Sequence, residues 1–73
     1  MDKTKLLLKL GNKIRYERLK RQLSQEKLAE LAEMSMRSIS LLECGYNNVQ
    51  YFSLAKIAEA FEMNISELTD FRL

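Results

Sequence analysis

Few side chains in this chain of 73 residues could perform covalent chemistry. There is no His and only one Cys, Cys44, which excludes a zinc site built from protein ligands alone and a Cys–His nucleophile–base pair. Several glutamates fall where exposed helix faces are expected, with no cleft implied: Glu30, Glu33, Glu59 and Glu62. We therefore expect no enzyme activity, no metal and no cofactor. The chemistry that remains is noncovalent binding.

The basic residues that could support such binding are concentrated near the N-terminus. Residues 1–22 contain eight Lys or Arg and two acidic residues, a net charge of +6, whereas residues 23–73 have a net charge of −4. The overall charge of +2 excludes a highly basic nucleic-acid coat protein, but not a local basic patch. The N-terminal block fits either a solvated helix face or a polyanion-binding surface, and charge alone does not separate the two.

The composition favours an all-α fold. Helix formers such as Leu, Glu, Lys and Ala are abundant, whereas Pro is absent and only two Gly occur. No apolar run approaches the roughly 20 residues that a membrane span needs. The unpaired Cys44 indicates a reducing compartment, for which the cytoplasm is the expected location. We expect residues 1–73 to form a single compact domain of five helices.

Capping residues and hydrophobic periodicity predict where these helices lie. The predicted ranges are 4–21, 25–32, 36–43, 49–61 and 65–71. The expected N-terminal caps of the last four helices are Ser24, Ser35, Asn48 and Asn64. Glu67 completes a capping box with the last of them, and Gly45 is expected at a left-handed stop after the third helix.

The second and third predicted helices form a helix-turn-helix unit. Such a unit needs a small residue where its helices touch, a place that Ala29 fills, and apolar residues in the turn and second helix, here Met34, Ile39 and Leu42. The major groove of DNA is wide enough to admit one helix. The start of the third helix, residues 35–37, then points outward.

Residues 10–71 resemble the Cro/C1-type helix-turn-helix family, the xenobiotic-response-element-like regulators that include the lambda-type phage repressors. The resemblance rests on residues 14–18 (IRYER), 23–29 (LSQEKLA), 35–45 (SMRSISLLECG), 54–61 (LAKIAEAF) and 65–68 (ISEL). It implies a lambda-repressor-like fold. It also implies that the chain is a small transcriptional regulator, expected to be a repressor, that binds double-stranded DNA sequence-specifically.

The resemblance also implies roles for individual positions. The residues that face base edges are Met36, Arg37, Ser40 and Leu41. The expected contacts to the DNA backbone are Gln25, Ser35, Tyr46, Asn47 and Asn48, and the basic Lys20 and Arg21 join them. Gln25 stands where the family has a Gln that grips a phosphate, aided by the positive end of the helix dipole. Arg18 and Glu43 match a buried ion pair between the first and third helices, with a structural role.

The sequence departs from the family pattern at four places. Gly, Gly and Pro are usual at three positions, which here hold Glu33, Gln22 and Val49. Where such a turn needs a positive φ, a residue other than Gly costs about 1 kcal/mol. The fourth departure is the exposed face of the third helix, which has one charged group, Arg37, beside Met36 and Leu41. Hydrogen-bond readout is therefore thin, although apolar side chains can contact thymine methyl groups.

A homodimer on operator DNA is the expected functional form, because one module of this size covers only a half-site. The candidate dimer surface consists of apolar residues near the C-terminus: Leu68, Phe71 and Leu73. The alternative for Phe71 is packing against the first helix. The main alternative function is a protein-interaction module, such as an antitoxin or the DNA-binding partner of a separate effector chain. Its interface would then be Leu31, Met36 and Leu41.

Overall fold

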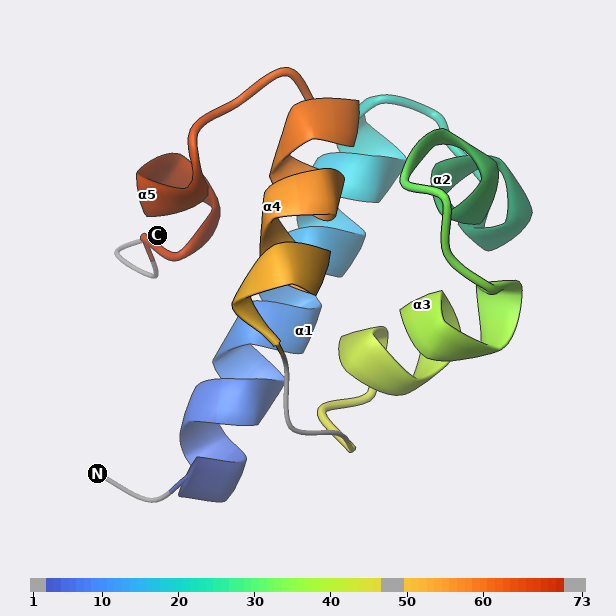
Figure 1. Ribbon diagram of the computed structural model, residues 1–73. Helices are drawn as coiled ribbons and strands as arrows, with labels where there is room; N and C mark the ends of the chain where they lie inside the picture. Colours follow the sequence, from blue (N-terminus) through green and yellow to red (C-terminus); the bar gives the residue numbers. More distant parts are fainter. Residues whose placement is uncertain (1–2, 47–49, 71–73) are drawn as a thin grey trace.

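The computed structural model describes residues 3–46 and 50–70, which form five α-helices without a strand among them. The helices are α1 (Lys3–Lys20), α2 (Gln25–Leu31), α3 (Met36–Glu43), α4 (Tyr51–Ala60) and α5 (Ile65–Leu68). In Figure 1, α2 and α3 lie on one side of α1 and α4, and α5 lies on the opposite side. The predicted all-α class is confirmed. Within the described residues, no helix is both long and apolar enough to cross a membrane.

The helix boundaries agree with the predicted ranges except at α4 and α5. The N-cap of α4 is Gln50, with an extended backbone and no side-chain hydrogen bond, so the prediction that Asn48 caps this helix is wrong. The capping box of Asn64 and Glu67 is present at α5. This helix ends at Leu68 rather than at residue 71, and both the amide and the hydroxyl of Thr69 donate to the Ile65 carbonyl, at 2.9 and 3.0 Å.

All five helices contribute to one apolar core. Its members are Leu10, Ile14, Leu28, Ala29, Ala32, Ile39, Leu42, Ile57, Ala58, Phe61 and Leu68. Leu68 is 0% exposed, so the expectation that it forms part of a dimer surface is wrong: the core takes up its whole side chain. The other two residues of that predicted surface, Phe71 and Leu73, lie outside the described residues.

Two residues after the last residue of each of the helices α1, α2, α3 and α4 lies a residue with a left-handed backbone. These residues are Gln22 (φ 58°), Glu33 (φ 55°), Gly45 (φ 75°) and Glu62 (φ 58°). After each of them, the next amide donates to a carbonyl five residues back: Leu23 to Arg18, Met34 to Ala29, Tyr46 to Leu41 and Met63 to Ala58. This is the Schellman motif, which satisfies carbonyls that the helix end leaves free. The sequence indicated three of these positions but missed Glu62.

Three of these positions hold side chains that a left-handed backbone disfavours. We expect Gln22→Gly, Glu33→Gly and Glu62→Gly each to raise the free energy of unfolding, by up to about 1 kcal/mol. Urea denaturation measures the change. Lys9→Gly, at an exposed site inside α1, is the control, and its free energy of unfolding should fall by roughly 1 kcal/mol. A loss of stability in all four variants would contradict strain at the turns.

Gly11 lies within α1, where Gly ordinarily lowers helix stability. The structure gives the reason for it: a Cβ atom at this position would lie 2.5 Å from the Leu42 carbonyl oxygen and 2.6 Å from that of Glu43. The backbone of α1 therefore approaches the last turn of α3 more closely than any side chain permits. This contact fixes the distance between the two helices.

Gly11→Ala should destabilise the protein by about 1–3 kcal/mol, because the added methyl group forces α1 and α3 apart. The matched control is Asn12→Ala, an exposed neighbour on the same helix, which should be neutral or slightly stabilising. Thermal unfolding of the two variants makes the comparison. Equal melting temperatures for both would show that the helices do not touch at Gly11.

Candidate nucleic-acid interface

The candidate site is built on α2 and α3, which pack against each other. Each of these helices begins with a serine cap. The Ser24 hydroxyl accepts a hydrogen bond from the Lys27 amide at 2.9 Å, and the Ser35 hydroxyl accepts one from the Ser38 amide at 3.0 Å. Such caps typically contribute about 1 kcal/mol each. Because Ile39 and Leu42 are buried, the opposite face of α3 is fixed in direction.

The four predicted base-reading residues lie along this outer face of α3. Met36 is 53% exposed and Arg37 is exposed, whereas Ser40 and Leu41 are half-buried. No described residue holds the Arg37 guanidinium. Its donors are therefore available to a ligand, and Arg37 and Met36 are the most accessible of the four.

The predicted backbone-contact residues fall into different surroundings. Tyr46 is 76% exposed just after the left-handed Gly45, and the Lys20 side chain is 59% exposed. The Ser35 hydroxyl is already engaged, because besides capping α3 it donates to the Ser38 hydroxyl at 2.8 Å. Asn47 and Asn48 lie outside the described residues.

Gln25, the predicted phosphate contact, is half-buried at the first position of α2. Its side-chain Nε2 donates to Oε1 of Glu43 at 3.1 Å. No sequence pattern indicated this contact, since the two residues are far apart in the chain. One of the two side-chain N–H groups is thus used inside the protein.

The predicted ion pair between Arg18 and Glu43 is confirmed. Arg18 Nε donates to Glu43 Oε2 at 2.6 Å and Nη2 donates to Oε1 at 3.0 Å, a bidentate arrangement. The side chains are 10% and 4% exposed. A third donor, Nη1, reaches the Leu23 carbonyl at 2.7 Å. The pair joins α1 to the end of α3 and to the turn before α2.

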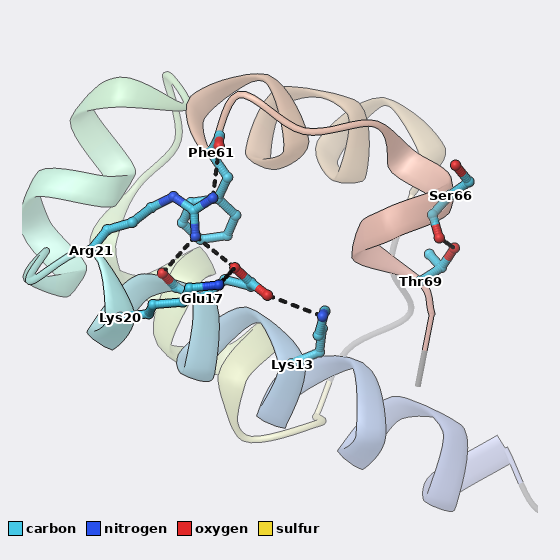
Figure 2. A network of polar contacts seen from close by, with 7 residues as sticks. All are labelled: Lys13, Glu17, Lys20, Arg21, Phe61, Ser66 and Thr69. Atoms are coloured by element: carbon cyan, nitrogen blue, oxygen red, sulfur yellow. Dashed lines mark hydrogen bonds and ion pairs between the residues drawn. The ribbon is translucent and has the colours of Figure 1, made fainter. Parts of the chain in front are cut away.

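Arg21, one of the predicted contacts to the DNA backbone, makes several hydrogen bonds within the protein through Nη1 and Nη2 (Figure 2). Nη1 donates to Glu17 Oε1 at 2.6 Å and to the Glu17 carbonyl at 3.0 Å, and Nη2 donates to the Phe61 carbonyl at 2.9 Å. The guanidinium carbon lies 4.8 Å from the centre of the Phe61 ring. Arg21 therefore ties the end of α1 to the end of α4.

Glu17 is a buried carboxylate that sequence reasoning did not single out. Lys13 Nζ lies 3.0 Å from Oε2, and Arg21 and Lys20 reach Oε1 at 2.6 Å and 4.0 Å (Figure 2). Burial raises the pKa of the Glu17 carboxyl. Hydrogen bonds from Arg21 and Lys13, with the charges of Lys13 and Lys20, outweigh burial and hold the pKa below its usual value. The helical spacing of three and four residues was the signal available in the sequence.

The basic N-terminal block is therefore used in two ways. Lys13, Arg18 and Arg21 neutralise buried carboxylates, whereas several cations remain exposed: Lys5, Lys9, Arg15 and Lys20. Neither of the two readings of the charge pattern was complete. A large share of the positive charge stabilises the fold, and the rest is available to a polyanion.

The fold and the outward face of α3 define a helix-turn-helix DNA-binding domain. Residues 14–68 match the model of the helix-turn-helix family HTH_3, and the chain belongs to this family. No curated protein matches the chain.

Solved structures with this fold include three regulators. The restriction-modification controller protein C.AhdI from Aeromonas hydrophila is 34% identical, with a TM-score of 0.83 over 85% of this chain and 94% of that chain. The clp gene regulator ClgR from Corynebacterium glutamicum is 26% identical, with a TM-score of 0.83 over 88% of this chain and 82% of that chain. An HTH_3 family transcriptional regulator from Vibrio cholerae, 24% identical, shares the fold with a TM-score of 0.86 over 92% of this chain and 38% of that chain.

Two of these proteins are regulators, and the third is a restriction-modification controller protein. The protein is accordingly a DNA-binding transcriptional regulator of the HTH_3 family.

Arg18→Met should lower the free energy of unfolding by about 3–5 kcal/mol, because it leaves the buried Glu43 carboxylate without its partner. Replacing both residues by apolar ones, Arg18→Met with Glu43→Leu, should cost much less, since no charge is then stranded. Urea denaturation of the single and double variants gives the two values. The exposed Arg15→Met should change stability by no more than about 0.5 kcal/mol. An unchanged stability in Arg18→Met would mean that the ion pair does not hold α1 against α3.

Proposed function

We propose that the protein is a repressor that binds operator DNA as a homodimer, with α3 in the major groove and no covalent chemistry. The observation that carries the proposal is the outer face of α3. There Arg37 and Met36 project from a helix whose inner face is fixed by Ile39 and Leu42. A rigid helix with an unengaged guanidinium suits the groove, which is wide enough for one helix.

The residues of this surface divide into those that read sequence and those that position the protein. Arg37 can donate two hydrogen bonds to the O6 and N7 of a guanine, the commonest specific contact in the major groove. Met36 and the half-buried Leu41 suit thymine methyl groups, and Ser40 can bond to either kind of base pair. Backbone contacts are assigned to Gln25, Lys20 and Tyr46, and four further expected contacts remain expectations: Arg21, Ser35, Asn47 and Asn48. Such contacts fix the register and carry no sequence information.

The homodimer is part of the proposal because a single module reaches only a half-site. With Leu68 in the core, the candidate surface near the C-terminus reduces to Phe71 and Leu73. A cytoplasmic location remains an expectation that accompanies this function.

Selection of bound sequences from a random duplex pool tests the proposal as a whole. We expect a palindromic consensus that contains one guanine per half-site flanked by thymines, because Arg37 is the long donor of the face and its neighbours are apolar. Sedimentation of the complex should give two protein chains per duplex. An enriched but asymmetric site would contradict the homodimer. No enrichment at all would favour the protein-interaction module.

Single substitutions then separate reading from positioning. Arg37→Ala should weaken the binding free energy for the selected duplex by about 1–3 kcal/mol and relax the choice of base at one position per half-site. Gln25→Ala should weaken binding to selected and scrambled duplexes equally. Lys20→Ala should make the slope of the logarithm of the binding constant against the logarithm of the salt concentration shallower, by at most about one unit. Titrations at two salt concentrations measure all three effects.

Arg15→Ala is the matched control for these titrations, because it removes an exposed arginine that is not among the assigned DNA contacts. This variant should leave the ratio of the affinities for the selected and the scrambled duplex unchanged. An equal loss on both duplexes for Arg37→Ala would make Arg37 a backbone contact. No loss, with binding intact, would remove α3 from the role of reader.

A further inference from the structure

The carboxylate of Glu43 is a meeting point of three helices. Glu43 is the last residue of α3, and its side chain is 4% exposed. Its Oε2 accepts from Arg18 Nε of α1 at 2.6 Å. Its Oε1 accepts both from Arg18 Nη2 at 3.0 Å and from Gln25 Nε2, at the start of α2, at 3.1 Å. The bond to Gln25 adds a function to a pair that would otherwise be purely structural.

An ionised carboxylate can only accept hydrogen bonds, so it fixes which end of the Gln25 amide faces it. Nε2 must point towards Glu43, and the carbonyl oxygen must point elsewhere. One of the two N–H groups on Nε2 is used in this bond, and the second stays free. Without the carboxylate, the long side chain would sample several rotamers and could present its oxygen instead of a donor.

A DNA phosphate, like a carboxylate, only accepts hydrogen bonds. The amide nitrogen of Gln25 can therefore bridge two anions, giving one N–H to Glu43 and the other to the phosphate. Arg18 compensates the charge of Glu43 at close range, so the buried carboxylate does not repel the phosphate as an isolated charge would. The Gln25 amide is a neutral donor, and the ion pair that holds it has no net charge. Such a donor is suited to a position between the Glu43 carboxylate and a phosphate.

We propose that Glu43 is a positioning residue for the phosphate contact of Gln25. This inference rests on the proposed function, in which Gln25 contacts the DNA backbone. In it, the pair of Arg18 and Glu43 does more than hold the helices together. It orders the Gln25 side chain before DNA arrives, so that the entropy of ordering is not lost on binding.

A double-mutant cycle tests the coupling, with binding measured on one duplex of about two helical turns and arbitrary sequence at low salt. Gln25→Met keeps the length of the side chain without its donors and should weaken binding about three- to tenfold, the value of one hydrogen bond. Glu43→Gln keeps the shape and removes the carboxylate, and should weaken binding about two- to fivefold. In the Gln25→Met background, Glu43→Gln should cause no further loss of affinity.

Stability is measured on the same four proteins, because Glu43→Gln also weakens the ion pair. It should lower the melting temperature in both backgrounds, while its effect on affinity disappears in one of them. A merely structural role would lower affinity by the same factor in both. Ile57→Val, a mildly destabilising change at a buried position of α4, is the control and should leave affinity unchanged.

The outcomes distinguish the positioning role of Glu43 from the proposed DNA binding on which it rests. If Gln25→Met weakens binding and Glu43→Gln is additive with it, the positioning role is wrong and the phosphate contact stands. If Gln25→Met has no effect while the duplex still binds, the phosphate contact is wrong and the positioning role fails with it. If the native protein binds no duplex, DNA binding itself fails.

A measurement on the native protein does not depend on the folding of any variant. In NMR spectra, one side-chain amide proton of Gln25 should exchange with water more slowly than the other, because Glu43 holds it. Addition of the duplex should then change mainly the chemical shift of the other Gln25 amide proton, the one that Glu43 does not hold. Equal exchange of the two protons would show that the bond to Glu43 does not form in solution, and would overturn the inference.

Discussion

The ion pair of Arg18 and Glu43 is the interaction on which the arrangement of α1, α2 and α3 depends. Removing two charges from water is costly, and this cost is recovered only when both partners meet in good geometry. The bidentate contact at 2.6 and 3.0 Å satisfies that condition. Because either charge alone would be heavily destabilising, the chain must bring the end of α3 against α1. The direction of the outer face of α3 follows from this constraint.

A second buried carboxylate, Glu17, lies next to Arg18 on α1 and organises a separate network. Glu17 gathers Lys13, Lys20 and Arg21, and Arg21 extends the network to the Phe61 carbonyl at the end of α4. The cations of α1 thus have two kinds of surroundings along one helix. Those that face inward neutralise carboxylates, and those that face outward give the surface its positive field. The charge of a helix cannot be assigned to DNA binding before these two groups are separated.

The backbone carries constraints that the side chains do not show. Gly11 lets α1 approach the carbonyl oxygens of Leu42 and Glu43, and four helices are followed by left-handed residues, only one of which is Gly. The left-handed residue is followed in three cases by an apolar side chain packed against the core: Leu23, Met34 and Met63. Burial of these side chains offsets the strain of the turn. The short connections that hold α2 and α3 in place are stabilised in this way.

Local information in the sequence determined the helices, most of their ends and nearly all of the core. In the third helix, for example, Ile39 and Leu42 were expected at inner positions, and the helical repeat brings them to one side. The family pattern added the ion pair of Arg18 and Glu43 and the left-handed positions Gln22 and Glu33. Glu62 escaped notice, although the apolar Met63 after it was the same signal that follows the other helix ends.

Tertiary structure alone decided the surroundings of several side chains. Gln25, Arg21 and Leu68 each have a residue type that suits an exposed binding role as well as an internal one. The structure turns the Gln25 amide towards Glu43, the Arg21 guanidinium towards Phe61 and the Leu68 side chain into the core. Hydrogen bonds and buried contacts act over a few ångströms between residues up to 40 positions apart. No local pattern specifies which of these distant groups will meet, because their meeting depends on how the helices pack.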